Sequence, residues 1–96
     1  MRIARVVGSA VSTIKVDSLR GSKLLVVREA SVTDELEGKP FVAVDGIGAG
    51  EGELVMFCQG SSARAAQGLK SIPVDAAIVA IIDRVEVHGK NLYKGG

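Results

Sequence analysis

The sequence predicts an all-β domain: a closed barrel of five strands with one short helix, assembled with copies of itself as a ring. Glycine and proline divide the chain into short segments rich in valine, isoleucine, leucine and phenylalanine, which is typical of strands. Several of these segments are apolar at every position, so both of their faces avoid water. The 96 residues suffice for one domain, which we expect to span residues 1–96.

The five predicted strands share an enrichment in β-branched and aliphatic residues and are separated by turn-forming residues. They are expected at residues 2–16, 22–30, 40–46, 53–59 and 78–87. At this length the most economical way to close five short strands is an OB-like barrel. Closure also removes the sheet edges that such apolar strands would otherwise expose.

A short helix is predicted between the fourth and fifth strands. Residues 61–68 begin with two serines that can cap a helix, continue with good helix formers, and end at Gly68. Pro73 then favours an extended backbone for the residue before it, so the chain re-enters the sheet from there.

The apolar strands indicate a subunit interface. A half-solvated strand alternates apolar and polar residues, but segments 24–27, 41–44 and 76–82 do not. Because 47% of the residues are hydrophobic, the chain has more aliphatic surface than one small core can bury. Identical neighbours in a ring are the simplest way to cover this aliphatic surface. The alternative is that it packs irregularly under loops of the same chain. An aspartate at Val79 or Ile81 is therefore expected to break the ring or unfold the chain.

Charge and composition argue against several classes of protein. The formal net charge is +1 with no basic run, which gives no indication of binding to nucleic acid or to an anionic membrane. The apolar runs are too short to cross a bilayer, and residues 1–5 lack the features of a secretory signal. The single cysteine, Cys58, excludes an internal disulfide, and a cytosolic setting fits these features.

Neither of the two usual reactive side chains has a visible partner. His88 is the single histidine, and it stands beside Gly89, so we interpret it as an exposed turn residue. Cys58 lies in an apolar strand with no cation close by in the sequence to lower its pKa, and we interpret it as a small buried side chain. No metal site and no catalytic residue are expected.

The glycine-rich segment 46–53 resembles a dinucleotide-binding loop only superficially. A Gly46 and Gly48 pair would need a third glycine where Glu51 stands, and a strand follows instead of a helix. We predict instead a tight turn, or a loop crowded against its symmetry mates around an axis, with Asp45 shaping the turn.

Two further groups of residues allow more than one interpretation. Segment 60–64 could bind an anion through a capped helix start and Arg64, but an ordinary cap with Arg64 in a subunit salt bridge is favoured. Asp75 and Asp83 flank the apolar run without forming a catalytic pair, and a partner across an interface explains them better.

Five segments in order resemble the EutN/CcmL family of bacterial microcompartment vertex proteins. The central one reads VDGIGAGEGELV, at residues 44–55. The others are residues 1–13, 21–27, 60–64 and 73–83. The resemblance covers nearly the whole chain, and the order of the segments makes it specific.

The resemblance implies a homopentamer of OB-like barrels that closes the vertices of a polyhedral shell in the bacterial cytoplasm. Hexameric facet proteins of another fold would be its partners, and no catalysis or cofactor is implied. An axial pore would be lined by Gly46, Gly48, Ala49, Gly50, Ser61 and Ser62. The subunit interface would include Arg64, Asp75, Val79, Ile81 and Asp83.

Two other functions remain as alternatives. An OB-type binder of single-stranded nucleic acid needs a basic groove and aromatic side chains for base stacking, whereas the sequence has three scattered aromatics. A small enzyme or ligand-binding barrel needs polar groups converging on a pocket, and one histidine and one cysteine provide little for it.

Overall fold

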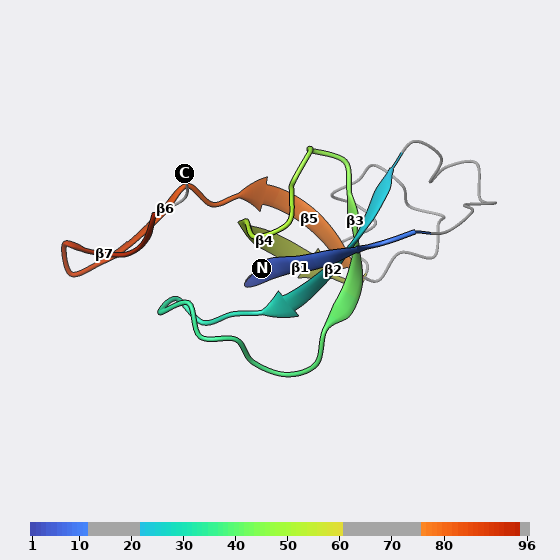
Figure 1. Cartoon of the computed structure of the whole chain (residues 1–96). Helices are drawn as coiled ribbons and strands as arrows, with labels where there is room; N and C mark the ends of the chain where they lie inside the picture. The colour runs from blue at the N-terminus through green and yellow to red at the C-terminus, as the bar shows by residue number, and fades with distance from the viewer. Residues whose placement is uncertain (12–21, 61–75, 95–96) are drawn as a thin grey trace.

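The computed structural model describes residues 1–11, 22–60 and 76–94, and these form seven strands (Figure 1). In chain order the strands are β1 (Arg2–Ala10), β2 (Lys23–Glu29), β3 (Phe41–Asp45), β4 (Leu54–Gln59), β5 (Ala76–Ile81), β6 (Arg84–Val87) and β7 (Lys90–Lys94). The first five close a barrel in the order β1-β2-β3-β5-β4, and the last two form a separate two-stranded sheet. The predicted five-stranded barrel is therefore confirmed.

Pairing around the barrel is antiparallel except between β3 and β5, which run parallel through Val44–Ala77 and Asp45–Ile78. The first four predicted strands match the observed ones closely: β1 ends at Ala10, and the predicted residues 12–16 lie outside the described residues. The predicted helix at residues 61–68 lies outside the described residues.

The barrel core is built from alternate residues of the strands, as the two-residue period of a strand requires. It contains only apolar side chains, and Phe41 and Phe57 meet in it with their ring centroids 5.0 Å apart. Its buried members are Ala4, Val6, Leu25, Val27, Ala43, Ala49, Val55, Phe57, Ala76 and Ile78. Because the described residues of one chain already form this core, the apolar side chains on the outside of the barrel need another explanation.

The prediction of one strand at residues 78–87 was wrong. The strand β5 ends at Ile81, the chain leaves the barrel after Ile82, and β6 begins a hairpin with β7. His88 and Gly89 form the two-residue loop, and their φ angles are 52° and 78°. Two positive φ values are what the tightest hairpin loops demand, and a His-Gly pair can adopt them. The interpretation of His88 as an exposed turn residue is confirmed.

Candidate functional site

The glycine loop that follows β3 is held from its base by Asp45. The Asp45 carboxylate is buried at 2% exposure and accepts hydrogen bonds from the backbone N–H groups of Ile47, at 3.0 Å, and Ala49, at 2.9 Å. A buried carboxylate that accepts from backbone donors satisfies both itself and the turn. The predicted turn-shaping role of Asp45 is confirmed.

The second half of the loop is fixed to strands β1 and β2. Glu53 accepts a hydrogen bond from the N–H of Gly50 at 2.6 Å, and the N–H of Gly52 donates to the carbonyl of Val6 at 2.8 Å. Lys23 on β2 donates to the carbonyl of Ala49 at 3.3 Å. With hydrogen bonds to both β1 and β2, the glycine loop is held in one conformation against the barrel wall.

Because of these contacts, some of the residues predicted to line an axial pore are buried and others are exposed. The side chain of Ala49 lies in the barrel core, and Gly50 is half-buried against the Glu53 carboxylate. Gly46 and Gly48 are exposed, and between them Ile47 is 46% exposed. The sequence analysis missed Ile47, although a large apolar residue between two glycines was a visible signal. Ser61 and Ser62 lie outside the described residues.

An apolar strip crosses the outer face of β1, β4 and β5. Ile3 pairs with Met56, and Met56 pairs with Ala80, so the three side chains lie in one row. Their sequence neighbours Ala4 and Val55 are core residues, which places the row on the opposite, outward side. All three are half-buried in one chain. We call this row the first outer strip.

A second apolar strip lies on β2 and β3, elsewhere on the barrel wall. Val26 pairs with Val42, which is 49% exposed, and Leu24 pairs with the buried Val44. Single exposed apolar residues are common, but a paired row on a second face is a marker of an interaction surface. The prediction that these strands are apolar on their outer faces is confirmed.

The described residues among those predicted for a subunit interface differ in position and in burial. Val79 is half-buried at the irregularity between β4 and β5. Ile81 packs against the barrel core, with part of its side chain exposed, and Asp83 is exposed where the chain leaves the barrel. Arg64 and Asp75 lie outside the described residues.

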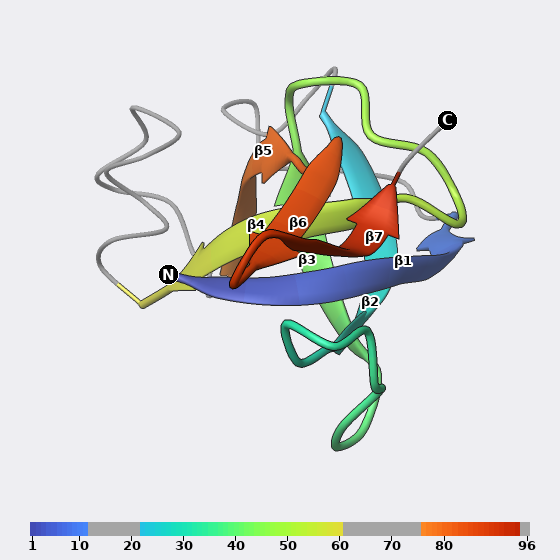
Figure 2. The same ribbon diagram turned by 90° about the vertical axis from the view of Figure 1, so that its left-hand side faces the viewer.

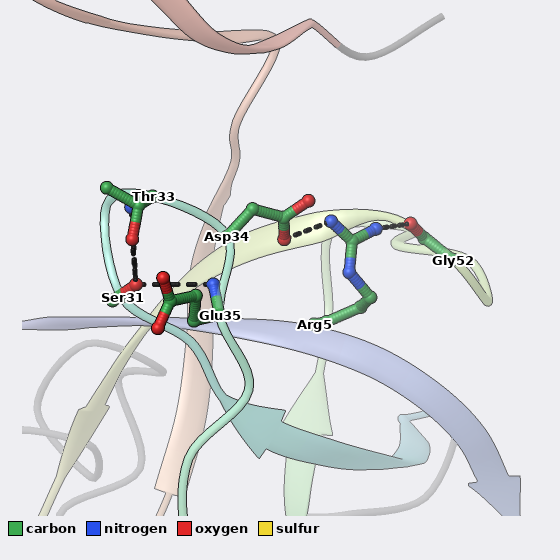
Figure 3. Close-up of polar contacts among 6 residues, drawn as sticks. All are labelled: Arg5, Ser31, Thr33, Asp34, Glu35 and Gly52. Carbon is green, nitrogen blue, oxygen red and sulfur yellow. Dashed lines mark hydrogen bonds and ion pairs between the residues drawn. The ribbon is translucent and has the colours of Figure 1, made fainter.

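Arg5 joins three segments at one end of the barrel, and the sequence analysis did not single it out. Its guanidinium donates hydrogen bonds to the carboxylate of Asp34 and to the carbonyl of Gly52, the latter at 2.6 Å (Figure 3). It also lies over the ring of Tyr93 on β7, 5.4 Å from the centroid. The hydrogen bond to Asp34 raises the pKa of Arg5 above its ordinary value, although burial acts in the opposite direction. Arg5 thus positions loop 31–40, the glycine loop and the hairpin on a common support.

The remaining candidate residues form no reactive group among the described parts of the chain. Cys58 is half-buried rather than fully buried as interpreted, and its thiol lies 3.9 Å from the carbonyl oxygen of Ala77. Residues 1–11, 22–60 and 76–94 hold no cluster of three potential metal ligands. Within the same residues, no helix has the length and apolar character needed to cross a membrane.

Comparison with known proteins gives matches along nearly the whole chain. Residues 1–83 match the family described as ethanolamine utilisation protein EutN/carboxysome. The carboxysome shell vertex protein CcmL of Synechococcus elongatus is 44% identical over 93 residues, covering 97% of this chain and 94% of that protein. A solved ethanolamine utilization protein, EutN, has a TM-score of 0.93 and 37% identity, covering 99% of each chain. The GrpN pentameric microcompartment shell protein from Rhodospirillum rubrum has a TM-score of 0.79 and 44% identity, covering 91% of this chain and 99% of that one.

Proposed function

The chain belongs to the EutN/CcmL family, and we propose that it is a structural shell subunit rather than an enzyme. Five copies form a ring that closes a vertex of a bacterial microcompartment shell. Hexameric shell proteins tile the flat facets around it, and the shell lies in the bacterial cytoplasm. A flat hexagonal layer cannot close on itself, so five-fold units at the corners supply the curvature.

The observation that carries this proposal is the apolar outer surface of a barrel whose described strands already enclose an apolar core. The first outer strip lies on β1, β4 and β5, while the second lies on β2 and β3. Two different faces on one subunit suit a head-to-tail contact, in which the first strip of one copy meets the second strip of the next. Such contacts close into a ring when the rotation between neighbours divides a full turn.

The glycine loop is proposed to face the axis of this ring. Its exposed part is small, comprising Gly46, Ile47 and Gly48, so that five copies can approach one another closely. Ser61 and Ser62 are proposed to lie near the same axis. For the interface we retain Val79 and Asp83 from the described residues, together with Arg64 and Asp75.

The aromatic side chains argue against the nucleic-acid alternative. Phe41 and Phe57 pack against one another at the barrel core, and Tyr93 lies against Arg5. A binder of single strands needs exposed rings on which bases can stack. Each of the three aromatic rings of this chain already contacts another side chain, and Phe57 is fully buried.

The vertex function is tested by assembling shells with and without this chain. We expect hexameric facet proteins, co-expressed with the chain, to give closed polyhedral particles with five-fold density at their corners by electron microscopy. Omission of the chain is expected to leave open or elongated shells. Particles that close equally well without it, or density for it on the facets, would refute the assignment.

A further inference from the structure

The hairpin β6–β7 lies beyond the barrel and has little support from its own chain. Figure 1 shows it extending from one end of the barrel, and in the turned view of Figure 2 it stands in front of the strands. Within the described residues, β6 and β7 pair with one another and with no barrel strand. An isolated two-stranded hairpin is marginally stable in water, so this one needs a surface to pack on.

The hairpin has one apolar face. Val85 pairs with Tyr93, and Val87, two residues further on, pairs with Lys90. The two valines and Tyr93 therefore share a face that carries Lys90 at the tip. Arg84 and Glu86 lie on the other face and form an ion pair at 3.2 Å. Toward the tip the apolar face is uncovered, since Val87 is 37% exposed.

At its base this apolar face joins the first outer strip. Tyr93 lies over Arg5, which pairs with Leu54 on the outward side of β1 and β4. The N–H of Ile82, just before the hairpin, donates to the carbonyl of Leu54 at 2.8 Å. Leu54, where the two surfaces meet, is buried at 1% exposure. From this point the strip crosses β1, β4 and β5, and the hairpin face extends outward past the barrel.

We propose that the hairpin is a clasp that lays its apolar face on the neighbouring copy of this chain. This inference rests on the proposed ring and adds to it a segment that reaches across the boundary between subunits. The occupant is a second copy because the hairpin face continues the surface that already faces that copy. The barrel wall alone would offer the neighbouring copy a narrow apolar strip. The strip and the hairpin together form a larger, angled surface that can contact two sides of that copy.

The charges at the hairpin tip fit the same occupant. Lys90 is exposed at the tip, and the exposed Glu35 and Glu37 lie in loop 31–40. None of these three side chains makes an ion pair with the residues that the structure describes. The acidic loop of one copy can therefore receive the basic tip of the next, which favours a defined register between subunits.

The test compares two aspartate variants of the full chain, Val87→Asp on the apolar face and Asn91→Asp on the polar face. We expect Val87→Asp to weaken the ring about tenfold or more, measured as its dissociation on dilution by analytical ultracentrifugation, and Asn91→Asp to change it about twofold at most. Circular dichroism checks that both barrels are folded. Equal ring stability for wild type and Val87→Asp would overturn the clasp.

Hydrogen exchange of the unmodified chain gives an independent reading that does not depend on a variant. Amides of residues 84–93 are expected to be protected in the ring and to exchange rapidly in monomers obtained by dilution. Equal protection in both states would overturn the clasp while leaving the ring intact. If Val87→Asp leaves the ring unchanged but prevents binding to facet proteins, the clasp on a second copy is likewise overturned. If the wild-type chain forms no ring at all, the proposed function itself fails, which is a different result.

Discussion

Replacing Ala80 with aspartate is expected to leave the barrel folded and to convert the ring into monomers. Ala80 ends the first outer strip, beside Met56, and is half-buried in a single chain. In a monomer the new carboxylate can reach water. In the ring it would be buried against an apolar neighbour without a partner, which costs about 3 kcal/mol or more at each interface. Light scattering after size-exclusion chromatography measures the change in mass, and circular dichroism checks the fold.

Two matched variants separate assembly from folding. In Ala80→Asn the new side chain has nearly the same shape as aspartate but carries no charge, so this variant is expected to weaken the ring much less. Ile81→Asp places the same charge one residue further along, where the side chain packs against the barrel core, and it is expected to unfold the chain. A ring that survives Ala80→Asp with unchanged mass would show that the first outer strip is not an interface.

Replacing Asp45 with alanine is expected to produce the largest loss of stability among single changes in the glycine loop. The substitution removes the acceptor for the N–H groups of Ile47 and Ala49, and the second of these hydrogen bonds is buried. A buried donor left without a partner costs about 1–3 kcal/mol, so the free energy of unfolding should fall by about 2–4 kcal/mol. Urea denaturation at a fixed protein concentration measures it, because dilution alone changes the stability of an oligomer.

The control for this change is Glu53→Gln, which keeps an acceptor for the N–H of Gly50. It is expected to cost less than about 1 kcal/mol. Hydrogen exchange adds a local reading, because the amide of Ala49 should lose its protection in Asp45→Ala. If Asp45→Ala were as stable as wild type, with that amide still protected, the buried carboxylate would not be what holds the loop.

Features of the fold that depend on residues close together in the sequence could be predicted. Turn residues divide the first four strands clearly, and the apolar runs 24–27 and 41–44 correctly predicted apolar outer faces on β2 and β3. The turn-shaping role of Asp45 could also be predicted, because an aspartate before a glycine-rich segment commonly accepts hydrogen bonds from the turn that follows.

The hairpin was missed because no glycine or proline separates the run 76–82 from the alternating residues that follow it. The signal for a new strand was the change of pattern itself, from continuous apolar residues to the alternation at Arg84–Val87, followed by the His88–Gly89 pair. A His-Gly loop is a weaker turn signal than Asn-Gly, and only the positive φ at both positions identifies it.

The role of Arg5 could not be predicted, because its partners are distant in the sequence. Asp34 lies 29 residues away, and Gly52 lies 47 residues away. Only closure of the barrel brings these segments beside one strand. The position of Ala49 had the same difficulty, because its neighbours are glycines and no periodic pattern shows which way it points. Ala49 is buried because its N–H group donates a hydrogen bond to the buried Asp45 and its side chain packs in the core.

The subunit count of the unmodified chain, measured by native mass spectrometry at micromolar concentration, tests the central claim most directly. The account predicts one dominant species with the mass of five chains, stable because the outer strips of neighbouring barrels cover one another. A folded monomer that persists as the dominant species as the protein concentration rises would contradict it, since the apolar outer faces would then be tolerated in water.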